Sequence, residues 1–314
     1  MEKKFVSVVV YLHNDAKIIT QFLDRVVPAI SRYFEQYELI CVDDACEDDT
    51  VLKIEDYVHD NELSGMISVV HMGIYQGMES SMNAGRDLAI GDFVYEFDSC
   101  YIDYEVELIT KVYEELLSGY DIVSASSTSG MRLTSRMFYR LYNKSNRGFN
   151  KIGPESFRIV SRRAINRIKS VGKYIPYRKA VYANCGLKTL SIPYKPMNGD
   201  KVKNRKAHFS QRGALALDSF IYFTNVLEKV SLIISMIFLL TTVLMGAYAV
   251  VDYFLESGIS EGWASTMCFM SLGFFGVFFL LTIILKYLSV LVNLVFKQTK
   301  YLVADIEKIS GRKS

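Results

Sequence analysis

The run YELICVDD at residues 37–44 decides the fold, because an apolar stretch of strand length ends there in two acids. Similar runs occur at 5–12 (FVSVVVYL), 66–72 (MISVVHM), 92–98 (DFVYEFD) and 120–126 (YDIVSAS). Segments with helical periodicity separate them, at 17–34, 50–61, 79–89 and 105–117. Strands that are apolar and alternate with helices predict an α/β domain whose mostly parallel sheet is covered by helices on both faces.

Polar and acidic residues follow three of these predicted strands. They are His13, Asn14, Asp15, Asp43, Asp44 and Asp98. The carboxyl ends of parallel strands share one edge of the sheet, and α/β proteins bind their ligands there. Carboxylates at this edge can accept hydrogen bonds from a base and a ribose, or hold Mg²⁺ or Mn²⁺ against a diphosphate. The alternative role for Asp44 or Asp98, taken alone, is a helix N-cap.

Two segments of the last third, 230–251 and 264–285, contain no charged residue over 22 positions each. A helix of that length is about 33 Å long at about 1.5 Å per residue, which predicts two transmembrane helices. The predicted outer loop 252–263 has three acids and no Lys or Arg, whereas the tail 286–314 is basic. Excess positive charge marks the cytoplasmic side. We therefore expect a multi-pass protein of the cell membrane, with residues 1–212 and both termini in the cytoplasm.

Residues 162–212 form a basic segment with fourteen Lys or Arg and one acid. Because it directly precedes the predicted membrane part, anionic lipid head groups are the favoured partner. A net charge of +2 for the whole chain gives no indication of a nucleic-acid partner. Residues 213–229 are apolar with few charges and are predicted to form an amphipathic helix in the membrane interface.

Several stretches, in this order along the chain, resemble family 2 glycosyltransferases. They are SVVVYLHND (7–15), ELICVDDACEDDT (38–50), NAGRDLAIGDFVYEFD (83–98), SRMFYRLYNK (135–144), ESFRIVSRRA (155–164), LALDSF (215–220), LKYL (285–288) and KQTKYLV (297–303). Within that family the chain is similar to the dolichol-phosphate mannose synthase group and to its bacterial relatives that load polyprenyl phosphate. The resemblance implies a GT-A-type (Rossmann-like) domain followed by two C-terminal transmembrane helices, a nucleoside-diphosphate sugar as donor and a polyprenyl phosphate as acceptor.

The chain departs from the family pattern at two motifs. The Asp-x-Asp metal motif of the family reads Asp98-Ser99-Cys100 here, so only the first carboxylate remains. Cysteine is a poor ligand for Mg²⁺, which prefers oxygen. Asp98 is therefore the single metal ligand that the resemblance assigns, and the use of Mg²⁺ or Mn²⁺ stays open. The family also has an acid at the position of Ser156, where this chain has Glu155 beside it.

The strand ends and the resemblance together assign the site residues. The residues expected to bind the nucleotide sugar are Tyr11, His13, Asp15, Asp43, Asp44 and Asp98. Those assigned to catalysis are Asp98, Glu155 and Arg158, and those assigned to the acceptor phosphate are Arg205 and Lys206. We expect a phosphate oxygen of the acceptor to attack the sugar C1 in line and to invert the anomeric centre. Arg158 is the candidate for stabilising the developing charge of the diphosphate.

Two other functions remain open at this point. The first is transfer to a hydroxyl of a lipid-linked glycan or of a cell-surface polysaccharide precursor, which needs a general base. The second is a catalytically inactive glycosyltransferase-like membrane scaffold, which the altered motifs at Cys100 and Ser156 favour. A homo-oligomer is compatible with the sequence under each of these functions.

Overall fold

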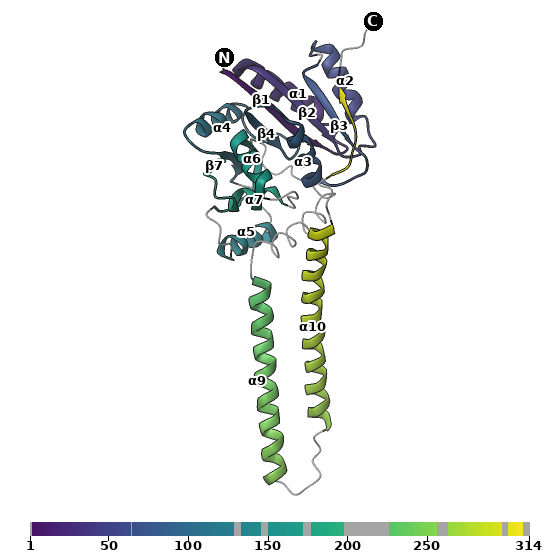
Figure 1. Cartoon of the computed structure of the whole chain (residues 1–314), viewed down its shortest axis with the longest axis vertical. Coiled ribbons are helices and arrows are strands. Elements are labelled where there is room, and N and C mark those ends of the chain that lie inside the picture. Colours follow the sequence, from purple (N-terminus) through teal and green to yellow (C-terminus); the bar gives the residue numbers. More distant parts are fainter. Residues whose placement is uncertain are drawn as a thin grey trace. The chain divides into compact units, whose positions relative to one another are not determined.

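The computed structural model describes residues 2–63, 65–128, 133–145, 150–171, 177–197, 226–255, 263–296 and 301–309 (Figure 1). The chain divides into two compact units, one of residues 1–219 with 298–314 and one of residues 220–297. Arg205 and Lys206 lie outside the described residues, as do residues 213–225 of the predicted interfacial helix.

The first unit alternates strands and helices as the sequence predicts. Its elements are β1 (Glu2–Leu12), α1 (Ile19–Tyr33), β2 (Phe34–Asp43), α2 (Thr50–Asp60), β3 (Ile67–Met72), α3 (Met78–Leu88), β4 (Phe93–Phe97), α4 (Glu107–Leu117), β5 (Ile122–Ser127), α5 (Leu133–Ser145), β6 (Glu155–Ser161), α6 (Arg162–Val171), α7 (Arg178–Asn184), β7 (Thr189–Tyr194) and β8 (Val303–Lys308).

The strands form one sheet in the order β7-β5-β6-β4-β1-β2-β3-β8. Strands β1 to β4 pair in parallel, as do β5 and β7. Strand β6 lies antiparallel between β4 and β5, and β8 lies antiparallel at the edge beside β3. The prediction of a mostly parallel α/β sheet is confirmed.

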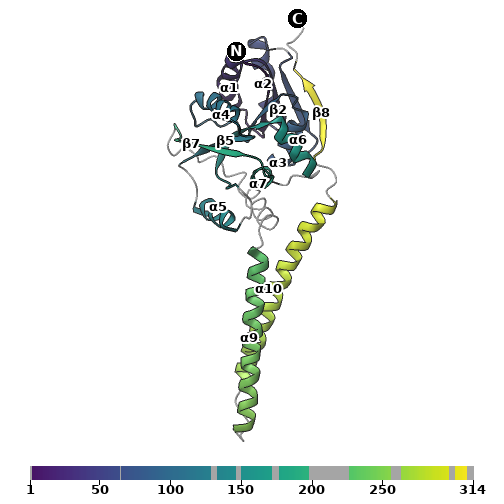
Figure 2. The same cartoon turned by 60° about the vertical axis from the view of Figure 1, so that its left-hand side comes forward.

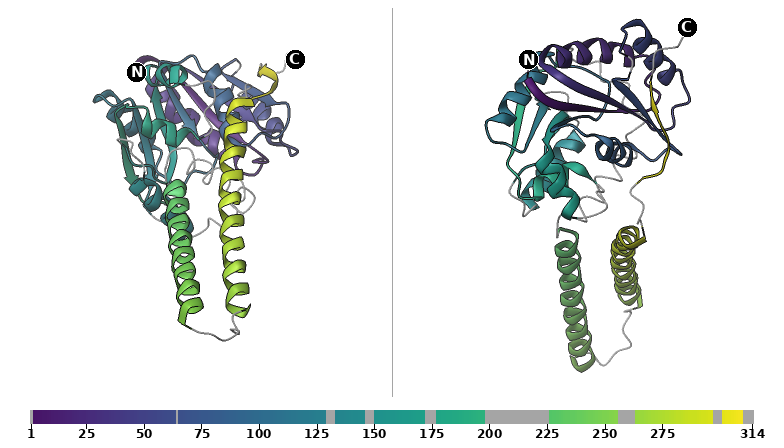
Figure 3. Two further views of the ribbon diagram at one scale, coloured as in Figure 1. Left: turned by 60° about the horizontal axis from the view of Figure 1, so that its bottom comes forward. Right: turned by 45° about the horizontal axis from the view of Figure 1, so that its top comes forward.

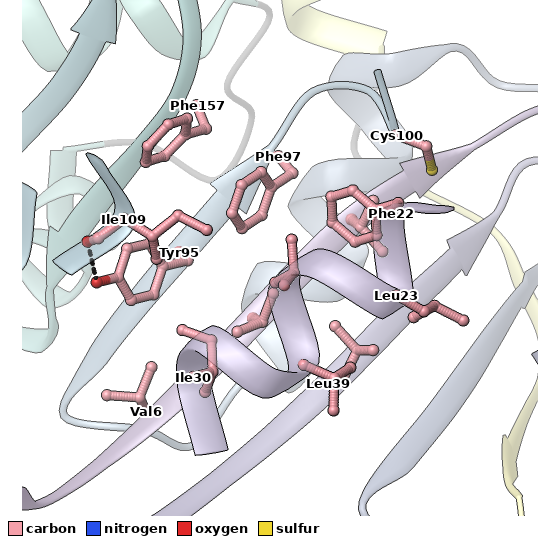
Figure 4. Close-up of a cluster of buried hydrophobic side chains, with 14 of the residues drawn as sticks. Val6, Phe22, Leu23, Ile30, Leu39, Tyr95, Phe97, Cys100, Ile109 and Phe157 are labelled. Carbon is pink, nitrogen blue, oxygen red and sulfur yellow. Dashed lines mark hydrogen bonds between the residues drawn. The ribbon is translucent and has the colours of Figure 1, made fainter. Parts of the chain in front are cut away.

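Both faces of the sheet are buried, which explains why the central strands are apolar throughout rather than alternating. Val8 of β1 packs on one face with α1, α2 and α4, while Val9 packs on the other face with α3 and α6. Figure 3 shows helices on both sides of the sheet. On the first face, Phe22 of α1 meets Phe97 edge to face with ring centroids 5.2 Å apart, and the Tyr95 hydroxyl donates to the Ile109 carbonyl at 2.8 Å (Figure 4).

Close backbone packing explains the glycine of the Ala84-Gly85 motif. A Cβ atom at Gly85 would lie 2.5 Å from methyl groups of both Val9 and Val42, because α3 rests directly on β1 and β2 there. A larger residue would overpack this contact. Gly85 thus allows α3 to pack closely against the sheet.

The second unit consists of two long helices, α9 (Val226–Leu255) and α10 (Trp263–Phe296) (Figure 2). Both extend beyond the predicted spans 230–251 and 264–285, so the predicted loop 252–263 and tail 286–314 are shortened accordingly. Among the residues that the structure describes, no helix combines the length and the apolar character needed to cross a membrane. The two predicted spans are therefore not supported as transmembrane helices by the structure.

Part of the tail 286–314, which the sequence predicts as a basic cytoplasmic segment, has regular structure. Its first residues continue α10, and Val303–Lys308 form β8 on the open edge of β3. The main chain of Leu302 bonds both to the side chain of Gln76 and to the amide of Gly73. An open strand edge offers unpaired backbone groups, and pairing satisfies them. The charges of the tail do not reveal this strand pairing, because β8 contains residues of both charges and its side chains are mostly exposed.

Candidate active site

The carboxyl ends of the parallel strands meet at one edge, as predicted. Leu12 of β1 lies opposite Asp43 of β2, and Val10 lies opposite Phe97 of β4. The residues that directly follow these strands are therefore neighbours, although they are up to 85 positions apart in the sequence. Because β6 is antiparallel, its first residue, Glu155, also lies at this edge.

Asp44 is fully buried and organises the loop before α3. Its carboxylate accepts hydrogen bonds from the backbone amides of Gln76 and Gly77, both at 2.8 Å, and from the Tyr11 hydroxyl at 2.9 Å. Burial, together with the Asp44 charge, raises the pKa of Tyr11, which therefore stays a neutral donor. Asp44 and Tyr11 thus fix the conformation of this edge of the sheet.

Asp43 lies beside Asp44 and is bound on both oxygens. One oxygen accepts from the amide of Cys46 at 2.8 Å, and the other lies 2.9 Å from Nδ1 of His71. The far nitrogen of His71 lies 3.6 Å from Glu307 of β8. His71 therefore connects this part of the edge to the C-terminal strand.

His13 and Asp15 shape the turn between β1 and α1. Nδ1 of His13 lies 2.8 Å from the carbonyl of Asp44, and its ring stands 4.5 Å from the ring of Tyr75. Burial raises the pKa of Asp15, whose carboxylate accepts from the amide of His13 at 3.1 Å. Tyr75 is 40% exposed, so the His13–Tyr75 pair presents an aromatic surface at the edge. The sequence analysis did not identify Tyr75.

Asp98 is held by two arginines. Nη2 of Arg158 donates to one carboxylate oxygen and Nη2 of Arg178 donates to the other, both at 2.7 Å. The same two arginines each donate through Nη1 to one oxygen of Glu96 at 2.8 Å, and Tyr182 donates to the other Glu96 oxygen at 2.7 Å. The pairing of β4 with β6 places Glu96 directly opposite Arg158.

Two further carboxylates complete this group. Glu155 accepts from Nε of Arg158 at 3.0 Å, and Glu79 accepts from Nε of Arg178 at 2.8 Å. We call the group the arginine–carboxylate cluster, and its members are Glu79, Glu96, Asp98, Glu155, Arg158, Arg178 and Tyr182. Glu96, Arg158 and Arg178 are completely buried.

The cluster keeps its acids ionised. Burial alone would raise the pKa of Asp98, but Arg158 and Arg178 outweigh it and hold that pKa well below its usual range. The pKa of Glu96 is lowered for the same reason, against its own burial, chiefly by Arg178 and Arg158. The two arginines have raised pKa values despite burial because of these carboxylates. All four groups are therefore charged at neutral pH.

The sequence analysis included Asp98, Glu155 and Arg158 but missed the rest of the cluster. Glu96 could have indicated the cluster from the sequence, since an acid within a buried strand requires a partner of opposite charge. Arg158 had been assigned to a developing diphosphate charge, whereas here three of its nitrogens bond to carboxylates and its side chain is inaccessible. Its observed contacts are those of a residue that positions Asp98.

The residues around Asp98 do not fit the Asp-x-Asp metal site of the family. Both oxygens of Asp98 are already occupied by arginines. The Cys100 thiol is buried, which raises its pKa, and it lies 3.9 Å from the carbonyl of Tyr11. Within the described part of the chain, no group of three or more His, Cys, Asp or Glu residues is arranged to hold a metal ion.

A second polar chain includes Ser156, which stands where the family has an acid. The Ser156 hydroxyl lies 2.5 Å from the hydroxyl of Tyr194, which in turn donates to Asp103 at 2.6 Å. Asp103 is thus connected to the Ser156 position through one tyrosine.

Residues 7–174 match glycosyl transferase family 2, which is more than half of the chain, and the protein belongs to this family. An uncharacterized glycosyltransferase of Synechocystis sp. is 28% identical over 188 residues, covering 57% of this chain and 57% of that protein. A prophage bactoprenol glucosyl transferase homolog of Escherichia coli is 23% identical over 269 residues, covering 83% of this chain and 86% of that protein.

The match to the Synechocystis relative spans less than two thirds of that protein's length. Among solved structures, the mannosyltransferase of Pyrobaculum calidifontis in complex with GDP-Man and Mn²⁺ superposes with a TM-score of 0.53. It is 15% identical, and the superposition covers 95% of this chain and 89% of that one. At this identity the likeness shows a common fold.

We expect Glu96→Gln to lower the free energy of unfolding by about 3–5 kcal/mol, the usual cost of breaking a buried ion pair. The amide would leave Arg158 and Arg178 without their shared counter-charge. Urea unfolding at neutral pH, followed by circular dichroism, measures the change. Arg32→Gln is the matched control, because Arg32 is exposed near the end of α1, where a substitution usually changes stability by no more than about 0.5 kcal/mol.

The same measurement has a defined pH dependence. Because the folded-state pKa values of Glu96 and Asp98 are lowered, their stabilisation is complete above the ordinary values of 4.5 and 3.8 and is lost as the pH falls below them. Wild-type stability should therefore decline below about pH 4.5, and Glu96→Gln should flatten this decline. An equal decline in both proteins would contradict the assignment of the acid-sensitive groups to the cluster.

Proposed function

We propose that this protein transfers a sugar from a nucleoside-diphosphate sugar to a polyprenyl phosphate, with inversion at the sugar C1. The observation that carries the proposal is the match to family 2 over the residues that build the polar strand edge, 7–174. The bactoprenol glucosyl transferase homolog, which aligns over 83% of this chain, supports a polyprenyl phosphate as acceptor.

The donor base and ribose are proposed to bind beside His13, Asp15 and Asp43. The exposed Tyr75 ring beside His13 offers a flat apolar surface for a base, and a neighbouring carboxylate can accept from base N–H groups or ribose hydroxyls. Asp44 lies behind this surface and supports the loop that carries Tyr75.

The reaction itself needs little from the protein beyond placement and charge. An oxygen of the acceptor phosphate forms the new bond to C1, while the bond from C1 to the diphosphate oxygen breaks and the nucleoside diphosphate leaves with the electron pair. A phosphate monoester is already an anion at neutral pH, so no strong general base is required. Ser156 in place of an acid is compatible with this acceptor. Placing the two reactants in line lowers the barrier by up to about 7–11 kcal/mol.

We also propose that the second unit anchors the protein in the cell membrane, with the sheet domain and both termini in the cytoplasm. Large apolar side chains of both helices are exposed, among them Leu240 at 61% and Phe275 at 67%. Exposed apolar surface on this scale is typical of a lipid or protein interface. The proposal also rests on the full sequence of the uncharged runs 230–251 and 264–285, since several of their side chains lie outside the described residues.

The transfer is tested with the purified full chain in detergent, polyprenyl phosphate and a panel of UDP-, GDP- and dTDP-sugars. We expect nucleotide release that requires the lipid phosphate. Asp43→Asn should lower kcat/KM about tenfold to a hundredfold, the effect of losing a hydrogen bond to a charged group. Asp60→Asn is the control, because Asp60 is exposed at the end of α2. Nucleotide binding without release from any donor would favour the inactive scaffold instead.

Membrane anchoring is tested by fractionating cells that express the full chain. We expect the protein to remain in the membrane pellet after an alkaline carbonate wash, because burial of the exposed apolar side chains in lipid is independent of charge. Recovery in the supernatant, with a known integral protein retained in the same pellet, would contradict the proposal.

Transfer to a hydroxyl acceptor is the second candidate, and the Ser156–Tyr194–Asp103 chain favours it. A hydroxyl must lose its proton, and Asp103 is the carboxylate that could receive it through Tyr194. If this function is right, Asp103→Asn should lower turnover of a glycan hydroxyl acceptor by about 10²-fold or more. The same variant should leave transfer to polyprenyl phosphate within a few-fold, so comparing the two acceptors separates the candidates.

A further inference from the structure

We infer that the arginine–carboxylate cluster takes the place of the divalent metal, so that this protein binds its nucleoside-diphosphate donor without one. The inference rests on the proposed function for the identity of the donor. It concerns Asp98, the one acid that remains of the family's metal motif.

The first argument is that a guanidinium already binds each oxygen of Asp98. Each oxygen accepts a charge-assisted hydrogen bond of 2.7 Å from a different guanidinium, which is the short distance expected of such bonds. A divalent ion binds a carboxylate oxygen at about 2.0–2.6 Å. It would therefore stand next to Arg158 and Arg178 and would be repelled by both.

The second argument is that neither arginine is free to move aside. Arg178 also donates from Nε and its backbone amide to Glu79, and from Nη1 to Glu96. Arg158 is tied in the same way to Glu96 and Glu155. Both side chains are completely buried. Displacing either one would leave buried carboxylates without their counter-charge, which is strongly unfavourable.

The third argument is that the other ligand positions are also unsuited to a metal. Cys100 stands where the family has its second acid, and its buried thiol lies near the carbonyl of Tyr11. Asp103, the next acid along the chain, is bonded to the hydroxyl of Tyr194. A hard cation would thus find one occupied carboxylate and one buried thiol where it requires several oxygens.

Two guanidiniums already stand at Asp98, where the family motif would place a metal ion. They are shared among all four carboxylates of the cluster, so neither has unpaired charge for the donor. The half-buried Lys179 follows Arg178 at the start of α7. The Lys179 ammonium lies 3.3 Å from the carbonyl of Glu155, at the same edge of the sheet. It is the described cation that we assign to the donor diphosphate.

The test measures Mn²⁺ directly, by the loss of the free-ion signal in electron paramagnetic resonance, on the full chain in detergent. We expect no Mn²⁺ bound at Asp98, either alone or with UDP or GDP added. We also expect EDTA to change the affinity for the bound nucleotide by less than about twofold. Mn²⁺ that binds one per chain and is lost in Asp98→Asn would overturn the inference, as would a tenfold loss of nucleotide affinity in EDTA.

Arg178→Gln provides a gain-of-binding test. It frees one oxygen of Asp98, so Mn²⁺ binding should appear in this variant. Binding should stay absent in the control Arg32→Gln, which removes an exposed arginine of α1. Should Arg178→Gln fail to fold, the wild-type measurement with Asp98→Asn still decides. Failure of both nucleotides to bind under any condition would count against the proposed function, while the Mn²⁺ titration of the chain alone would still test this inference.

Discussion

Charge compensation at the end of β4 is the constraint on which the rest of the site depends. Glu96 and Asp98 are two acids on one face of a central strand, and they remain buried and ionised only because Arg158 and Arg178 stand between them. These contacts join β4 to β6 and to α7, and Glu79 adds α3. A single group of ion pairs therefore fixes four elements that are far apart in the sequence. Such an arrangement specifies one geometry, because any displacement leaves a charge unpaired.

The parts of this design that depend on local pattern could be predicted from the sequence. Apolar runs predicted the strands, and the rule that parallel strands end together placed Asp43 and Asp98 at one edge. The partner of Asp98 could not be predicted in this way. Arg178 belongs to a basic segment whose composition suggested contact with lipid, and its position follows from the packing of α7 on the sheet. Composition gives the number of charged residues in a segment. Which of them form ion pairs depends on burial and on how the strands and helices pack.

The C-terminal strand β8 also could not be predicted from composition. The prediction for the tail rested on its lysines and arginines. In the structure, β8 pairs with β3 through backbone hydrogen bonds, which side-chain charge does not predict. The pairing has a consequence for the candidate site. Gln76 bonds to Leu302 through its side chain and to Asp44 through its amide. The segment that follows α10 is thereby connected to the loop that carries Tyr75.

The altered metal motif and the buried Glu96 are best understood together. Two guanidiniums carry the same positive charge as a divalent ion, and here they are shared among the four carboxylates of the cluster. In this chain an acid stands at position 96, inside the strand, and position 100 carries Cys100, which is packed in the core. Glu96 binds both arginines from inside the strand, whereas the Cys100 thiol offers a hard cation no oxygen ligand. Asp98, the acid that remains of the motif, is therefore held on both of its oxygens by arginines that Glu96 fixes in place.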